Sequence, residues 1–77
     1  MAEDSGALQE QLRTLDAEVA EMRQTVAGLR RGIGNSSDAP VDAADMAAAI
    51  TSAQEQEAVL KLLEAKRDDV QRRLANQ

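Results

Sequence analysis

The first half of the chain places an apolar residue at alternating spacings of four and three positions. The members of this series are Leu8, Leu12, Leu15, Val19, Met22, Val26, Leu29 and Ile33. This alternation is a heptad repeat, which is typical of an α-helix with one narrow apolar stripe. We therefore predict a helix over about residues 5–33, with Ser5 or Asp4 as its N-cap. Because such a stripe is unfavourable in water, a second helix must cover it.

A less regular heptad repeat occupies the second half of the chain. Its positions hold Met46, Ala49, Ala53, Gln56, Leu60, Leu63, Arg67, Val70 and Leu74. Asp42 and Asp45 have the spacing of a capping box, so we predict a second helix over about residues 42–75 with Asp42 as N-cap. Ile50 and Val59 lie beside the repeat and are expected to widen its apolar face.

The segment between the two repeats, about residues 34–41, is expected to break the helix. Gly32 and Gly34 are expected to end the first helix in left-handed conformations, and Pro40 prevents the helix from continuing. Two helices of similar length joined by a short connection predict an antiparallel hairpin, with residues 1–77 as a single domain. The predicted fold class is thus all-α, an antiparallel two-helix coiled-coil hairpin.

The alternative is that the first helix pairs in parallel with the first helix of a second copy. Its heptad alternates β-branched residues with Leu or Met, which is a preference of parallel two-stranded coils. In that arrangement Glu18 would face Arg23 of a second copy. The two arrangements are compatible in a dimer of hairpins.

The chain is short and has no aromatic residue, so it has little with which to build a large core. We expect the hairpin to self-associate into a four-helix bundle, or to dock on a larger protein through the wider face of the second helix. The residues expected to carry this contact are Ile50, Val59, Leu60, Leu63 and Val70. Gln56 and Arg67 would set the register, Arg67 with Asp16 as partner; alternatively, Arg67 extends to solvent.

Charge and composition exclude several classes of function. A net charge of −5 disfavours nucleic-acid binding, and no apolar run approaches the ~20 residues of a membrane span, so a cytoplasmic protein is expected. The sequence contains no cysteine and no histidine, which removes thiolate metal sites and the commonest catalytic bases. We therefore predict a non-enzymatic protein–protein interaction and oligomerisation module without cofactor or metal.

Acidic residues gather around the connection, at Asp38, Asp42 and Asp45. They are interpreted as helix caps and a solvated loop, or alternatively as a tip that binds a larger protein assembly. The second interpretation would make the chain a small regulator, for example of transcription. In general shape the predicted hairpin is similar to that of the Gre-type transcription-cleavage factors, but none of that family's motifs occurs in this connection.

Further charged residues near the end of the second helix form favourable i,i+4 pairs in the sequence, Asp68 with Arg72 and Asp69 with Arg73. They predict a solvent-exposed face linked by ion pairs.

Overall fold

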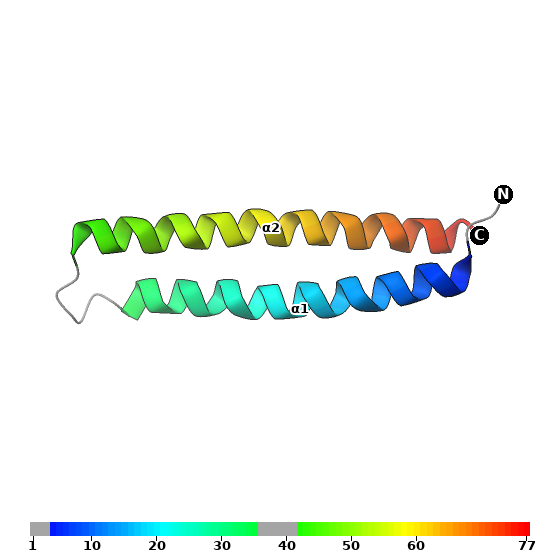
Figure 1. Cartoon of the computed structure of the whole chain (residues 1–77), viewed down its shortest axis with the longest axis horizontal. Helices are drawn as coiled ribbons and strands as arrows, with labels where there is room; N and C mark the ends of the chain where they lie inside the picture. Colours follow the sequence, from blue (N-terminus) through cyan, green and yellow to red (C-terminus); the bar gives the residue numbers. More distant parts are fainter. Residues whose placement is uncertain (1–3, 36–41) are drawn as a thin grey trace.

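A computed structural model describes residues 4–35 and 42–77, and this part of the chain is all-helical. Helix α1 spans Ser5–Asn35 and helix α2 spans Ala43–Ala75. The two helices lie side by side and antiparallel, with both chain ends at the same end of the molecule (Figure 1). The predicted all-helical, hairpin-like fold is confirmed, and the predicted helix limits hold to within two residues.

Aspartates cap the beginnings of both helices. The Asp4 carboxylate accepts a hydrogen bond from the Gly6 N–H at 3.0 Å, so the cap of α1 is Asp4. The Asp42 carboxylate accepts from the Ala44 N–H at 3.1 Å, which confirms Asp42 as the N-cap of α2. This bond goes to the second residue of the helix, whereas a capping box would use the third, Asp45.

The prediction that Gly32 and Gly34 end the first helix in left-handed conformations is wrong. Helix α1 continues through both to Asn35, and no glycine among the described residues has a positive φ. A glycine within a helix costs only about 1 kcal/mol relative to alanine. The last stripe residue, Ile33, is half-buried beside α2, and this packing favours the helical conformation. Residues 36–41, with Pro40, lie outside the described part.

The core of the hairpin is a single line of side chains between the helices. Its fully buried members are Leu8, Leu15, Val19, Val26, Ala53 and Val70. At the end with the chain termini, Leu8, Leu15 and Val70 form one cluster, against which Leu12, Leu63 and Leu74 pack. The molecule is correspondingly thin, with extents of 59 × 15 × 14 Å.

Two ion pairs between the helices define the antiparallel register. Arg23 donates to Glu64 at 2.7 Å, and Arg30 Nε donates to Glu57 at 2.7 Å. The arginines are seven residues apart on α1, and the glutamates are seven residues apart on α2 in the opposite order. Arg23, which would bind Glu18 of a second copy in the parallel alternative, is thus occupied within its own chain.

Candidate interaction surface

The hairpin has two long edges, and ion pairs cover one of them. We define the closed edge as the side that carries Arg23 and Arg30 of α1 and Glu57 and Glu64 of α2. These residues share one heptad position on each helix, immediately beside the apolar stripe. Their side chains are one-third to one-half exposed and bridge the two helices along this side.

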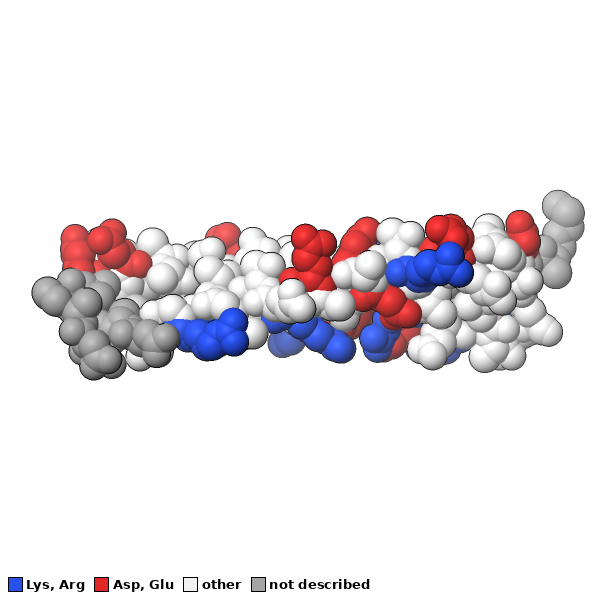
Figure 2. All heavy atoms as spheres, turned by 90° about the horizontal axis from the view of Figure 1, so that it is seen from below, with Lys and Arg blue, Asp and Glu red and all other residues white. Residues whose placement is uncertain are grey.

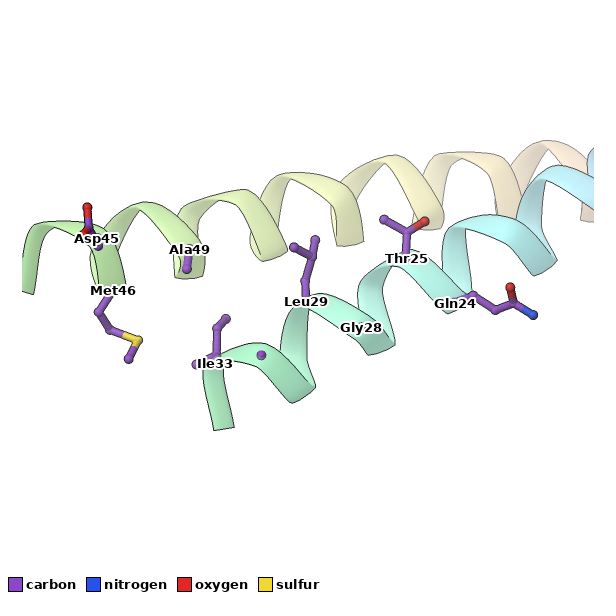
Figure 3. A pocket seen from close by; sticks show the side chains of 9 residues that line it. Gln24, Thr25, Gly28, Leu29, Ile33, Asp45, Met46 and Ala49 are labelled. Atoms are coloured by element: carbon purple, nitrogen blue, oxygen red, sulfur yellow. The ribbon is translucent and has the colours of Figure 1, made fainter. Parts of the chain in front are cut away.

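The opposite side, which we call the open edge, is hollowed near the connection. A groove of about 480 Å³ lies between the helices there. Its lining residues are Gln24, Thr25, Gly28, Leu29, Gly32, Ile33, Asp45, Met46 and Ala49. Figure 3 shows Leu29, Ile33 and Met46 pointing toward the space between the helices.

Small residues produce this groove. A Cβ atom added to Gly28 or Gly32 would meet nothing within 4 Å, so no side chain from α2 occupies the space above them. On α2 the groove is lined by Asp45, Met46 and Ala49, and Ala49 offers only a methyl group. The space is many times the ~30 Å³ of one water molecule, and most of its lining is apolar.

The hollow continues along the open edge toward the middle of the hairpin. A second, smaller depression of about 270 Å³ is lined by Glu18, Glu21, Met22, Thr25 and Leu63. Thr25 lines both depressions, so they adjoin each other on one side of the molecule. The open edge therefore presents an elongated surface, with a mostly apolar groove near the connection and the carboxylates of Glu18 and Glu21 at the smaller depression.

Ile50 and Val59, which the sequence assigned to one face of the second helix, lie on different edges. They are nine residues apart, and at about 100° per residue this separation is half a turn. Ile50 precedes Glu57 by seven residues and belongs to the closed edge. Val59 follows Asp45 by fourteen residues and belongs to the open edge. Their exposed fractions are nearly equal, 40% and 41%.

The other predicted contact residues face α1 to different degrees. Leu60 is half-buried, and Leu63 is half-buried and packs on the core cluster. Val70 is only 3% exposed and is a member of that cluster. Val70 therefore contributes to the core of the hairpin and is unavailable to a partner.

Leu62 is an exposed apolar residue that the heptad analysis missed. It is 66% exposed, the highest value among the large apolar residues described. Leu62 lies outside the stripe, but it follows Val59 by three residues, and such neighbours share a helix face. An apolar i,i+3 pair outside the stripe is the signal that would have identified it.

Arg67, the charged residue of the stripe, contacts α1 weakly. Its Nε atom lies 3.8 Å from a carboxylate oxygen of Asp16, so the predicted partner is present at a distance too long for a hydrogen bond. One terminal nitrogen instead donates to Asp68 on the same helix at 3.2 Å. The Nε atom is buried and has no hydrogen-bond partner. Gln56, the other polar residue of the stripe, is half-buried.

The structure explains two of the three acidic residues around the connection. Asp42 caps α2 and Asp45 lies in the first turn of α2, where a carboxylate is favourable, while Asp38 lies outside the described residues. Figure 2 shows acidic side chains gathered at the loop end. In the described segments no group of three or more His, Cys, Asp or Glu residues is placed to hold a metal ion. No helix there is long and apolar enough to cross a membrane.

Ion pairs near the end of α2 follow the prediction in one of two cases. Asp69 pairs with Arg73 at 3.2 Å, as the i,i+4 spacing predicts. Arg72 lies 3.6 Å from Asp69, and Asp68 bonds with Arg67, so the predicted pair of Asp68 with Arg72 is replaced by shorter-range contacts.

No protein-family model matches this chain, and comparison with curated proteins and with solved structures gives no significant match.

Proposed function

We propose that this protein is a non-enzymatic interaction module that self-associates by helix packing, with a four-helix bundle as the assembled form. The observation that carries the proposal is the open edge. On this edge a groove with a mostly apolar lining lies near the connection, and the exposed side chains of Val59 and Leu62 lie farther along the same edge, about 15–20 Å from Ala49 along α2. A second helical surface would cover these apolar groups and remove them from water.

The thinness of the hairpin supports the same proposal. Only six apolar residues among those described are fully buried, and Val19 is the only large one below 2% exposure. Ordering a backbone costs about 1–2 kcal/mol per residue, and one line of small aliphatic side chains offsets little of this. Covering the open edge would add buried apolar surface to a fold that has little of its own.

Sedimentation equilibrium, with far-UV circular dichroism followed over the same dilution series, tests this proposal. We expect a dimer or tetramer of hairpins whose helicity decreases as it dissociates on dilution. We expect helicity and association to be coupled because binding of a second copy to the folded hairpin stabilises the fold by mass action. A fully helical monomer at all concentrations would refute self-association.

A further inference from the structure

We propose that a second copy of the chain docks along the open edge in an antiparallel orientation, with a two-fold axis close to Glu55 and Gln56 of α2. This inference rests on the proposed self-association and specifies the surface and geometry through which it occurs. In a two-fold interface the same surface is used by both copies and must be complementary to itself. On the open edge, the two halves of α2 differ in side-chain size, and the two ends of one column of side chains differ in charge.

Complementarity of size follows from the unequal halves of α2. On the open edge, the half that precedes Glu55 carries the small residues Ala48, Ala49 and Ser52, with Asp45 and Met46 nearer the connection. The half that follows it carries larger ones, Val59, Leu62 and Leu63. A two-fold axis between the halves sets each large residue against a small one of the other copy.

In this arrangement Leu62 lies opposite Ala49 of the second copy, and Ala49 lines the groove. The space above Gly28 and Gly32 is open at that position and would receive the leucine side chain. Leu62, the most exposed of the large apolar residues described, is thereby matched with the groove, and each copy supplies one of each.

Complementarity of charge follows from the same axis. Asp45, Ser52, Val59 and Lys66 are spaced seven residues apart and form one column beside the stripe of α2. Antiparallel pairing of this column places Lys66 of each copy opposite Asp45 of the other and Val59 opposite Ser52. The column thus ends in opposite charges, as an antiparallel self-contact requires.

Val59→Glu and Leu62→Glu test the surface, with Ile50→Glu as the matched control. Ile50 has the same exposed fraction as Val59 within one per cent, but it belongs to the closed edge. We expect the two open-edge variants to weaken self-association at least tenfold in sedimentation, and the control to leave it within about threefold. Equal effects of Ile50→Glu and Val59→Glu would overturn the proposal.

Charge exchange tests the orientation. We expect Lys66→Asp and Asp45→Lys each to weaken self-association several-fold, and the double variant to recover it, because the double exchange restores opposite charges at both contacts. Lys61→Glu, elsewhere on α2, is the control for the change in net charge. Failure of the double variant to recover would contradict the pairing of Asp45 with Lys66.

Single cysteines give a second test of orientation, since the wild-type chain has none. A disulfide requires Cα atoms within about 7 Å, which residues beside the two-fold axis can satisfy. We expect Glu55→Cys to form covalent dimers on mild oxidation. Lys66→Cys should not, because the two copies of that position would lie about 30 Å apart along the helix. Efficient cross-linking at position 66 would indicate a parallel contact and overturn the proposal.

The experiments separate this inference from the proposed function. A wild-type chain that stays monomeric refutes both. A wild-type chain that associates, with open-edge variants that associate equally well, refutes only the antiparallel open-edge contact.

Discussion

Among single residues, the polar side chains near the stripe have local roles that their contacts define. Asp42 completes the hydrogen bonding at the beginning of α2, whereas Arg67 brings a guanidinium into the apolar stripe without satisfying its Nε atom. We therefore expect Asp42 to stabilise the hairpin and Arg67 to lower its stability, and both expectations can be tested.

Asp42→Ala should lower the free energy of unfolding by about 0.5–2 kcal/mol, because it removes the acceptor for the Ala44 N–H. Urea unfolding followed by circular dichroism at one fixed protein concentration would measure the change. Asp42→Asn is the control, since asparagine caps helices about as well as aspartate. If both variants lost the same stability, the carboxylate would be acting through its charge instead of as a cap.

Arg67→Leu should raise the free energy of unfolding by up to about 1 kcal/mol, because it removes from the stripe a half-buried guanidinium whose Nε atom has no hydrogen-bond partner. Asp16→Ala should change it by less than about 1 kcal/mol, since its 3.8 Å ion pair is largely exposed. Thermal unfolding of both variants at matched concentration gives the comparison. A destabilised Arg67→Leu would show that Arg67 contributes to the fold through its ion pairs.

At the scale of the elements, the apolar spacing predicted both helices, and the short connection between them predicted their antiparallel pairing. The heptad repeats locate α1 and α2 because a period near 3.5 residues is specific for helices that pack on one another. The limit at Gly34 was wrong because local propensity is small compared with the packing of Leu29 and Ile33. The end of α1 thus depends on its contacts with α2, and a local sequence pattern does not contain this information.

The open edge was only partly accessible to sequence reasoning. Val59 was identified as exposed and apolar, but assigning Ile50 to the same face ignored the half turn between them. The groove itself is a property of two helices together, since it needs Gly28 and Gly32 of α1 to lie beside Ala49 of α2. Pairing of specific small residues across the hairpin depends on the register of the two helices, which a heptad pattern does not determine because it repeats every seven residues.

Gly34→Ala should stabilise the hairpin by up to about 1 kcal/mol, because alanine favours the helix and the added Cβ meets open space. Gly34 does not line the groove, so self-association should change only as far as the more stable helix favours the folded, associating form. Gly32→Leu, by contrast, should fill the groove and weaken self-association while the helix content is retained. Circular dichroism and sedimentation together distinguish the two effects; stronger association of Gly32→Leu would contradict a role for the groove.

On the scale of the whole molecule, the hairpin is a thin rod. Its radius of gyration is 17.4 Å, whereas a globular chain of this length would have about 11–12 Å. A rod has a large surface for its volume, so its stability depends strongly on what covers its sides.

Small-angle X-ray scattering distinguishes how two such rods associate. Side-by-side antiparallel docking should raise the radius of gyration only to about 19 Å, because neighbouring helices pack about 10 Å apart. End-to-end contact of the same rods would give roughly 34 Å. The measurement needs a concentration at which sedimentation shows the dimer, and the larger value would exclude contact along the open edge.

Both ends of the chain leave the hairpin at the same end of the rod (Figure 1). In the antiparallel pair, the termini of the two copies would therefore lie at opposite ends of the assembly. The length of the rod, 59 Å, then acts as a ruler between whatever is attached to each copy. Two fluorophores at Gln77 would be far apart in the antiparallel pair and adjacent in a parallel one, so the distance between them reports the orientation of the two rods.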